Sequence, residues 1–534
     1  MQTISWKPNE EQINHSKMRE FIQFVNERFG FSFDSYPQLY NWSIDRSEDF
    51  WVSFWEYSNI IHHSPYTQVV DDLNKMPGAK WFEGATLNFA ENLLKYRDTK
   101  MAIWFYGENG DQSSLTYKEL YDQVSRLAQS MRGMGIVKND RVVGFMPNIP
   151  ETTIAMLATS SIGAIWSSCS LDFGIKGVLD RFKQIEPKLI FTSGSYWYNG
   201  KQIACLSKVK KILMNLPSIK QTIIVPFAGS PKMNVIKNSI LWNDFLHKDS
   251  GDIVFEPLPF DHPLYIMYSS GTTGLPKSIV HSAGGTLIQH LKEHQLHADL
   301  ARDDTIFYFT TCGWMMWNWL ISSLAVGATI VLYDGSPFYP DGTALLKMAD
   351  ELGITVFGTS AKYISSLESE GIEPKAISTF PKLRTILSTG SPLVEENFDF
   401  VYGQWKEDVQ LASISGGTDI ISCFALGNPI LPVWRGELQC RGLGMKVEAF
   451  NEFGKSEMNS KGELVCSQAF PSMPVYFWND PDGKKYHSAY FDTFPNIWHH
   501  GDFIKINDHG GIKIYGRSDT TLNPGGIRIG TAEI

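Results

Sequence analysis

Residues 268–278, YSSGTTGLPKS, follow the apolar run PLYIM and combine small residues with one cation. A buried strand followed by a loop of Gly, Ser and Thr brings backbone amides close to phosphate oxygens, because the small side chains let the chain approach. The hydroxyl groups add hydrogen-bond donors, and Lys277 adds a mobile positive charge. The stretch therefore predicts a site for the phosphates of a ligand.

Two other structures could account for a Gly- and Ser-rich loop that ends in a lysine: a Walker A loop and an ordinary turn. A Walker A loop needs its second glycine directly before the lysine, and counting from Gly271 that position holds Pro276. The spacing therefore excludes a Walker A loop. An ordinary turn between a strand and a helix stays open on the evidence of this loop alone.

The complete string is more specific than its glycines, because it resembles the phosphate loop of the adenylate-forming superfamily. This family comprises the acyl-CoA synthetases, the luciferases and the adenylation domains of peptide synthetases. The resemblance implies that the loop holds the pyrophosphate part of ATP. The residues that it assigns to the loop are Ser269, Ser270, Gly271, Thr272, Thr273, Gly274 and Lys277.

Further stretches follow in the order that this family requires. STGSPL (388–393) resembles the turn that lies along the adenine, and SISGGTDI (413–420) resembles a motif that ends Thr-Glu in relatives. Here the second motif ends with Asp419, whose carboxylate is a ligand that Mg²⁺ prefers and reaches less far than glutamate. Outside such a motif, an acid in a Gly-rich loop is usually a turn former. The nucleotide contacts implied by the two stretches are Gly390, Ser391, Pro392, Ser413, Ile414, Ser415, Gly417 and Thr418.

Two stretches near the C-terminal end complete the resemblance. WHHGDFIKI (498–506) resembles the segment whose aspartate, here Asp502, accepts both ribose hydroxyls. YGRSDTTLNPGGIRIG (515–530) resembles the junction between the large and small domains of the family. By this match Arg517 lies near the ribose, Asp519 is the hinge, and Arg528 contacts the α-phosphate with a guanidinium that pairs with phosphoryl oxygens. Without the motif, Arg528 would be an ordinary surface arginine.

The resemblance implies an AMP-forming ligase with ATP, Mg²⁺ and coenzyme A. A carboxylate attacks the α-phosphate to give an acyl-adenylate and pyrophosphate, and the CoA thiolate then takes the acyl group and releases AMP. The implied catalytic residues are Lys277, Thr273 and Arg528, which would cancel charge on the α-phosphoryl group. The family's catalytic lysine belongs to a C-terminal domain beyond Ile534, so we expect that domain to be missing and adenylation to be weak.

The resemblance also bears on the acid. Acetate-specific relatives carry a tryptophan at the position of Gly416, so the glycine implies a pocket for a larger acid. Gly313 and Trp314 are implied near this pocket, and Arg181 near the CoA nucleotide. Several stretches look most like the acetoacetyl-CoA synthetase branch, which implies acetoacetate. Propionate, butyrate and branched acids stay open, because one methylene changes discrimination by only about 1–3 kcal/mol.

The pattern HLKEH (290–294) offers a function from another class. His290, Glu293 and His294 match the inverted zinc-protease motif, and His297 extends the stripe along the expected helix. The same residues are equally compatible with a partly solvated helix that has polar faces. A zinc metalloprotease is therefore the rival prediction, and an ATP-binding protein without catalysis is a third.

The elements around these motifs alternate between strand and helix. Apolar runs at 101–107, 141–146 and several later places are short and β-rich, and amphipathic stretches lie between them. Thr116 and Glu119 form a capping box at one helix start. The pattern predicts an α/β fold in which parallel sheets are covered by helices, with two lobes separated by residues 217–239. The expected units are an N-terminal cap (1–100), the two lobes (101–430), a smaller β-rich subdomain (431–518) and a hinge segment (519–534).

Composition limits the remaining classes of function. The net charge of −10 gives no support for nucleic-acid binding. The N-terminus lacks the apolar core of a signal peptide, and the longest apolar stretch, 320–333, is too short to span a bilayer. The six cysteines are scattered without a CxxC pattern, which predicts reduced thiols. We expect a cytoplasmic enzyme of small molecules, monomeric or homodimeric, without a nucleic-acid or membrane partner.

Overall fold

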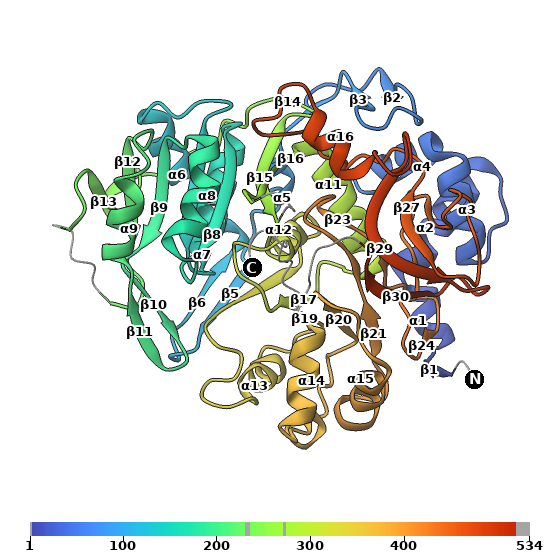
Figure 1. Ribbon diagram of the computed structural model, residues 1–534. Coiled ribbons are helices and arrows are strands. Elements are labelled where there is room, and N and C mark those ends of the chain that lie inside the picture. Colours follow the sequence, from blue (N-terminus) through green and yellow to red (C-terminus); the bar gives the residue numbers. More distant parts are fainter. Residues whose placement is uncertain (1–2, 230–234, 271–273, 519–534) are drawn as a thin grey trace.

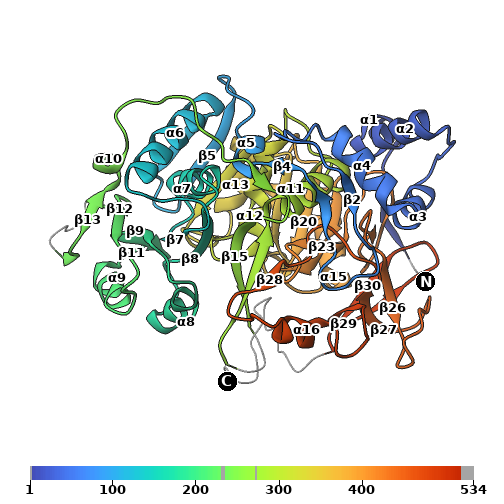
Figure 2. The same ribbon diagram turned by 90° about the horizontal axis from the view of Figure 1, so that it is seen from above.

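The computed structural model describes residues 3–229, 235–270 and 274–518, and Figure 1 shows how their helices and strands are arranged. Two large, mainly parallel sheets form the centre, which confirms the predicted α/β class. The aromatic N-terminal segment and the β-rich C-terminal segment pack on the same side of this centre (Figures 1 and 2).

Within the described residues, the larger sheet has eight strands in the order β13-β12-β9-β7-β8-β15-β16-β28. From β13 to β15 neighbouring strands run parallel, whereas β16 and β28 are antiparallel to their neighbours. The strands in chain order are β7 (Arg141–Met146), β8 (Ile165–Ser170), β9 (Leu189–Ser193), β12 (Gln221–Val225), β13 (Ser239–Leu241), β15 (Pro263–Ser269), β16 (Lys277–Ser282) and β28 (Tyr476–Phe477).

The second sheet has seven strands among the described residues, in the order β21-β20-β19-β17-β18-β5-β6. All are parallel except β6, which forms a hairpin with β5. The strands in chain order are β5 (Met101–Gly107), β6 (Gln112–Thr116), β17 (Thr305–Tyr308), β18 (Thr329–Asp334), β19 (Val356–Ser360), β20 (Thr385–Thr389) and β21 (Gln410–Ser413).

The two sheets exchange strands along the chain. β5 and β6 precede the strands of the larger sheet but join the second sheet, while β15 and β16 return to the larger one. The expected separator at 217–239 is a wrong prediction, because it contains β12, and Thr222 to Val225 are buried between β9 and β13. Its flanking Pro and Gly residues resemble a linker, but they end a short buried strand.

The predicted helices cover and separate the sheets. α6 (Tyr117–Gly133) begins with the predicted capping box, in which the Thr116 backbone N–H donates to Glu119 at 2.8 Å. α7 (Pro150–Ser161) and α11 (Ala283–Lys292) are almost wholly buried, so neither has a solvent face. The other helices of the two sheets are α8 (Ile175–Ile185), α9 (Leu206–Leu213), α10 (Trp242–Phe245), α12 (Met315–Ser322), α13 (Ala344–Glu351), α14 (Ala361–Ser369) and α15 (Glu395–Phe400).

The first hundred residues form helices that the sequence did not reveal. They are α1 (Glu10–His15), α2 (Lys17–Phe29), α3 (Tyr36–Asp45), α4 (Ser47–Tyr57) and α5 (Phe89–Leu93). Aromatic side chains on several faces hide the helical period, because α2, α3 and α4 pack against one another as well as against the rest of the chain. The Tyr40 hydroxyl donates to the Met445 carbonyl at 3.0 Å and ties this segment to the C-terminal part.

The β-rich C-terminal part contains a four-stranded antiparallel sheet and, beside it, a three-stranded one, as far as the residues are described. The former consists of β26 (Val447–Phe450), β27 (Gly462–Cys466), β29 (Trp498–Ile506) and β30 (Ile512–Arg517), and the latter of β22 (Ser415–Gly417), β23 (Ser422–Leu426) and β25 (Cys440–Arg441). α16 (Lys484–Tyr490) precedes β29. All six cysteines are buried and unpaired. Among the described residues, no helix has the length and apolarity needed to cross a bilayer.

Candidate active site

The two ends of the predicted phosphate loop lie opposite each other in a hairpin. β15 ends at Ser269, β16 begins at Lys277, and the antiparallel register pairs these two residues. Gly274, near the end of the loop, has φ +105°, a conformation that other residues adopt only with strain. Ser270 begins the loop. The predicted loop residues outside the described part of the chain are Gly271, Thr272 and Thr273.

Asp419 is the point at which the phosphate loop meets the 413–420 motif. Its side chain is 1% exposed, and its Oδ1 accepts hydrogen bonds from Lys277 Nζ at 2.9 Å and from Ser269 Oγ at 3.3 Å. The Tyr490 hydroxyl also donates to Oδ1. The lysine predicted to bind phosphate and the aspartate predicted to bind metal therefore form one ion pair in this structure.

His281 fixes the backbone just before Asp419. Its Nε2 donates to the Thr418 carbonyl at 2.8 Å. Burial lowers the pKa of His281 to about 4, although this hydrogen bond and the charge of Asp419 act in the opposite direction. The ring is therefore neutral at pH 7 and holds the Thr418 turn without adding a charge.

The two segments predicted to bind the adenine side of the nucleotide lie side by side. β20 and β21 are parallel neighbours with Ser388 opposite Ser413, and the Thr389 hydroxyl donates to the Ile414 carbonyl at 2.8 Å. Both segments thus leave the same, carboxyl edge of the sheet, where ligands of parallel sheets bind. Gly390 turns the first segment with φ +93°. The predicted contacts brought to this edge are Gly390, Ser391, Pro392, Ser413, Ile414, Ser415, Gly417 and Thr418.

The two residues predicted near the ribose also meet. Asp502 on β29 and Arg517 on β30 are directly opposite in the sheet, with Arg517 Nη1 at 3.3 Å from Asp502 Oδ1. His500 Nε2 lies 3.5 Å from the other carboxylate oxygen of Asp502. Arg517 thus lies beside the Asp502 carboxylate, whose two oxygens can accept hydrogen bonds from two hydroxyl groups.

The residues predicted near the acyl group lie at the start of α12. Gly313 lines a cavity of about 10 Å³ with Ser168 and Asn318, which is room for about one water molecule. Trp314 is 41% exposed, so its indole faces solvent instead of closing this cavity. The implied pocket role of both residues stays a prediction.

A side chain at position 416 would clash with a neighbouring strand, which the sequence did not suggest. A Cβ atom at this position would lie 2.0 Å from the Ser422 carbonyl oxygen and 2.6 Å from the Cys423 Cα. The glycine therefore permits β22 and β23 to approach closely, and any side chain here would require the backbone to shift. The implied role of Gly416 in an acyl pocket stays a prediction, and in this structure its Cβ direction points at β23.

Arg181, the residue predicted near CoA, lies on α8. Its guanidinium lies 4.9 Å from the ring centroid of Phe173 and 5.6 Å from that of Tyr268, and Nη1 donates to the Gly177 carbonyl at 2.7 Å. Since Tyr268 directly precedes Ser269, the arginine is held beside the strand that leads into the phosphate loop. Asp519 and Arg528 lie outside the described residues.

The histidine stripe predicted as a zinc alternative is a buried cluster in which most ring nitrogens hydrogen-bond to protein groups. His290, Glu293, His294 and His297 are each at most 2% exposed. The contacts are His290 Nδ1 with Ser322 Oγ at 2.8 Å and Nε2 with Ile421 O at 2.7 Å, His294 Nε2 with Trp319 O at 2.8 Å, and His297 Nδ1 with Gly427 O at 2.9 Å. Glu293 accepts from Ser422, Cys423 and Trp319. The zinc prediction is wrong, because among the described residues no group of three or more His, Cys, Asp or Glu side chains could hold a metal ion.

Magnesium fits the site only as part of the nucleotide. Among the described residues, no three His, Cys, Asp or Glu side chains converge on a common point. Mg²⁺ usually keeps several waters and binds through one or two carboxylates together with substrate phosphates. Asp419, beside the phosphate loop, matches that pattern for a cation that arrives as MgATP.

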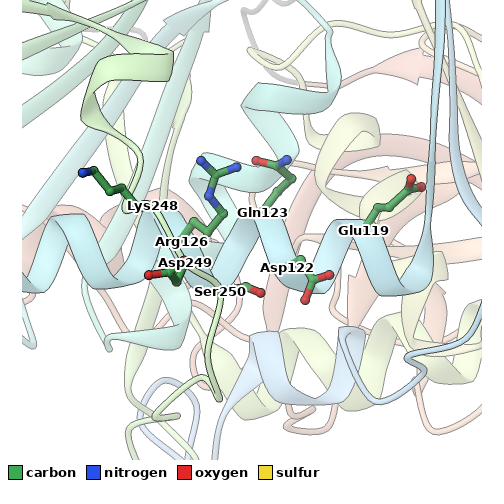
Figure 3. A pocket seen from close by; sticks show the side chains of 7 residues that line it. All are labelled: Glu119, Asp122, Gln123, Arg126, Lys248, Asp249 and Ser250. Carbon is green, nitrogen blue, oxygen red and sulfur yellow. The ribbon is translucent and has the colours of Figure 1, made fainter.

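A larger pocket, of about 420 Å³, lies on another part of the molecule. Figure 3 shows its lining along α6 and a neighbouring segment: Glu119, Asp122, Gln123, Arg126, Lys248, Asp249 and Ser250. None of the predicted site residues belongs to it. Its open, mixed-charge lining gives it no chemistry comparable to the Asp419 region.

The sequence analysis did not identify roles for Tyr490, whose hydroxyl donates to Asp419, and for Trp498, on which Tyr490 stacks. Tyr490 ends α16, and its ring stacks on Trp498 with centroids 3.8 Å apart and an interplanar angle of 15°. Both residues belong to an aromatic-rich stretch that carries no recognisable spacing. The proximity of this stretch to Gly501 and Asp502 in the 498–506 motif was the signal available.

The chain is similar to proteins of one known family. The model of the AMP-binding enzyme family matches residues 89–473, and that of the acetyl-coenzyme A synthetase N-terminus matches residues 36–93. Acetoacetyl-coenzyme A synthetase of Rhizobium meliloti (strain 1021) is 55% identical, covering 99% of this chain and 81% of the relative. Malonamoyl-CoA synthetase of Penicillium aethiopicum is 41% identical, covering 97% and 75%.

A solved structure supports the same assignment. The acetoacetyl-CoA synthetase from Streptomyces lividans superposes with a TM-score of 0.93 at 41% identity, covering 99% of this chain and 82% of that one. The family model spans well over half of this chain, from the start of α5 to the segment before β28. The chain therefore belongs to the family of AMP-binding enzymes, the adenylate-forming superfamily that its motifs resemble.

Proposed function

We propose that this protein is an AMP-forming acid–CoA ligase that converts acetoacetate to acetoacetyl-CoA. In the first half-reaction a carboxylate oxygen of the acid bonds to the α-phosphorus of ATP, and pyrophosphate leaves. In the second, the CoA thiolate attacks the acyl carbon of the adenylate, and AMP leaves. The observation that carries the proposal is the convergence of Lys277, Ser269 and Asp419 where the phosphate hairpin meets the 413–420 motif.

The first half-reaction needs positive charge at the phosphates. Lys277 pairs with Asp419 and keeps 24% of its side chain exposed, so we assign its ammonium group to the phosphates. Magnesium bound with the nucleotide would supply further charge neutralisation at the phosphoryl oxygens. Thr273 and Arg528 remain proposed partners of the α-phosphate. Positioned cations of this kind stabilise the charge that gathers on the phosphoryl group in the transition state.

The proposal extends to the rest of the nucleotide. The edge formed by β20 and β21 takes the adenine, because the segments 388–392 and 413–418 leave it side by side. Asp502, held between Arg517 and His500, accepts the ribose hydroxyls. Arg181 is the proposed contact of CoA, and its guanidinium lies against the ring of Tyr268 on β15, directly before the phosphate loop.

The choice of acid rests on the relatives. One is named for acetoacetate and one for malonamate, and both acids carry a carbonyl group β to the carboxylate. This shared group favours a β-carbonyl acid over propionate, butyrate or a branched acid. A polar partner for that carbonyl would reject analogues that lack it, since a buried polar group left unpaired loses binding free energy.

The decisive experiment is calorimetric binding of non-hydrolysable acyl-adenylate analogues in Mg²⁺ buffer, which requires no turnover. Acetoacetyl and butyryl analogues form a matched pair, because they share a four-carbon chain and differ in the keto group. We expect the acetoacetyl analogue to bind at least about tenfold more tightly. Equal binding would contradict acetoacetate as the acid, and binding of neither analogue would contradict the ligase.

The location and assembly of the protein belong to the same proposal. All six cysteines are unpaired, which is typical of a reducing compartment such as the cytoplasm. We keep the monomer and the homodimer as the proposed states, and sedimentation of the purified chain distinguishes them.

A further inference from the structure

Tyr490 contacts both charged residues of the phosphate site. Its hydroxyl donates to Asp419 Oδ1, and Lys277 Nζ lies 3.3 Å from the same hydroxyl oxygen, to which it donates. Lys277 Nζ also lies 4.9 Å from the centroid of the Tyr490 ring, within the range of a cation–π interaction. One side chain thus contacts the carboxylate and the cation at once.

The direction of the Tyr490 hydroxyl is fixed by its surroundings. The ring is 4% exposed and is stacked on Trp498, with Phe477 and Tyr486 packed edge-on at 5.9 and 5.8 Å. The start of α16 is fixed as well, because the Asp480 carboxylate accepts the backbone N–H groups of residues 485 and 486. The hydroxyl is therefore presented to Asp419 by a rigid support.

A contact chain runs from Tyr490 toward the ribose site. Trp498, stacked on Tyr490, donates through Nε1 to His500 Nδ1 at 3.4 Å. His500 in turn lies 3.5 Å from Asp502. The stacked pair of Tyr490 and Trp498 therefore connects Asp419, at the phosphate loop, with Asp502, at the predicted ribose site.

We propose that Tyr490 is a positioning residue for MgATP: its hydroxyl holds Asp419 toward the phosphate loop and gives Lys277 a resting partner before the nucleotide binds. The proposal rests on the ligase function proposed above. When Lys277 turns to the phosphates, Asp419 loses that donor but keeps the hydrogen bonds of Tyr490 and Ser269. The carboxylate therefore stays aimed at the cation that accompanies the phosphates.

The variant Tyr490→Phe tests this role, because it removes the hydroxyl and leaves the stacked ring. Tyr486→Phe is the matched control on the same helix. Tyr486 is 5% exposed, and within the described part of the chain its hydroxyl has no hydrogen-bond partner. Each variant removes one buried phenolic oxygen from α16, but only Tyr490→Phe removes contacts to Asp419 and Lys277.

The readouts are calorimetric dissociation constants for MgATP and for AMP, which lacks the β- and γ-phosphates. For Tyr490→Phe we expect MgATP to bind about 10- to 100-fold more weakly, as for loss of a hydrogen bond to a charged group. Its AMP affinity should change less than about threefold, and Tyr486→Phe should match the wild type for both ligands. Titrating Mg²⁺ at fixed ATP should show a higher Mg²⁺ requirement for Tyr490→Phe alone.

Other outcomes separate this proposal from the function on which it rests. Unchanged MgATP binding by Tyr490→Phe, or equal losses for MgATP and AMP, would overturn the positioning role. A Tyr490→Phe protein that unfolds at 25 °C would assign the hydroxyl a structural role and overturn it as well. If the wild type binds neither MgATP nor AMP, the proposed ligase itself fails. Wild-type binding with an unaffected variant removes the positioning role and leaves the ligase intact.

Discussion

Two groups of charged residues lie at opposite ends of the segment formed by β16 and α11, and only one of them has the geometry of a site. At the β16 end, Lys277 is partly exposed and pairs with Asp419 beside a loop. At the far end of α11, Lys292 and Glu293 are fully buried, with Nζ and Oε1 3.9 Å apart. There the histidines and the glutamate bond to neighbouring backbone and side chains. The contrast shows that a cluster of catalytic residue types becomes a site only where some of its atoms can reach a ligand.

Glu293→Ala should give the largest effect, because the buried end of the comparison serves stability. The variant removes the acceptor of the Ser422 hydroxyl and the Trp319 indole N–H, and it leaves Lys292 as a buried charge. We expect a loss of about 3–5 kcal/mol in the free energy of unfolding, measured with denaturant. Glu370→Ala, at an exposed glutamate, should change it by less than about 0.5 kcal/mol. A loss below 1 kcal/mol for Glu293→Ala would contradict a stabilising role for the buried group.

Asp419→Asn should affect catalysis more than folding. The amide keeps the shape of the side chain but loses the charge that pairs with Lys277 and suits Mg²⁺. We expect kcat/KM for MgATP to fall about 100-fold, with a melting temperature within a few degrees of the wild type. Asp122→Asn, on the distant pocket of Figure 3, is the control and should leave both unchanged. A large drop in melting temperature without a kinetic effect would place Asp419 with the structural group.

Acid should weaken the buried histidine group before it affects most carboxylates. Burial lowers the pKa of His290 to about 4 and that of His297 to about 3, and the pKa of His294 also lies well below its usual value. The unfolded chain therefore binds more protons below pH 6.5, so stability falls as the pH drops from about 6.5 toward 4.

Two buried carboxyl groups act in the opposite sense. Burial raises the pKa of Asp299 to about 6 and that of Asp334 to about 7, so the folded chain holds their protons as the pH falls. The net loss at pH 5.5 relative to pH 7 should be about 1–3 kcal/mol by denaturant unfolding. His290→Gln should reduce this loss, and an identical pH dependence in that variant would contradict the assignment.

Zinc should have the smallest effect of all. Both ring nitrogens of His290 and Nε2 of His294 already contact protein groups at 2.7–2.8 Å, so a zinc-selective chelator should leave the melting temperature unchanged. Metal analysis of the purified protein should show no stoichiometric zinc. Bound zinc together with a chelator-dependent drop in melting temperature would reverse the correction made above.

Much of the fold was predictable because local patterns agreed with the tertiary structure. The apolar run at 101–107 forms β5, the box of Thr116 and Glu119 caps α6, and the runs at 263–269 and 385–389 form β15 and β20. The motifs of the nucleotide site were identifiable for the same reason, since their glycines and hydroxyl residues serve backbone turns that local sequence dictates. The family assignment followed from the order of these motifs.

What the sequence did not reveal depends on partners far away in the chain. The helices α2 to α4 carry aromatic residues on several faces, because each packs on more than one neighbour. The reason for Gly416 lies in the backbone of β23, and the role of Tyr490 depends on α16 reaching across to Asp419. Neither contact leaves a periodic signal in its own segment.

The exchange of strands between the two sheets has a consequence for synthesis on the ribosome. β5 is synthesised early but pairs with β18. The Tyr117 hydroxyl of α6 likewise donates to the Ala328 carbonyl, which lies 211 residues later in the chain. β8 also pairs with a strand that is synthesised much later, β15. The nascent chain cannot complete one lobe before the other begins, so its strand edges stay exposed until the later strands are synthesised. Fragments that end between the two lobes should aggregate, because they leave both sheets incomplete.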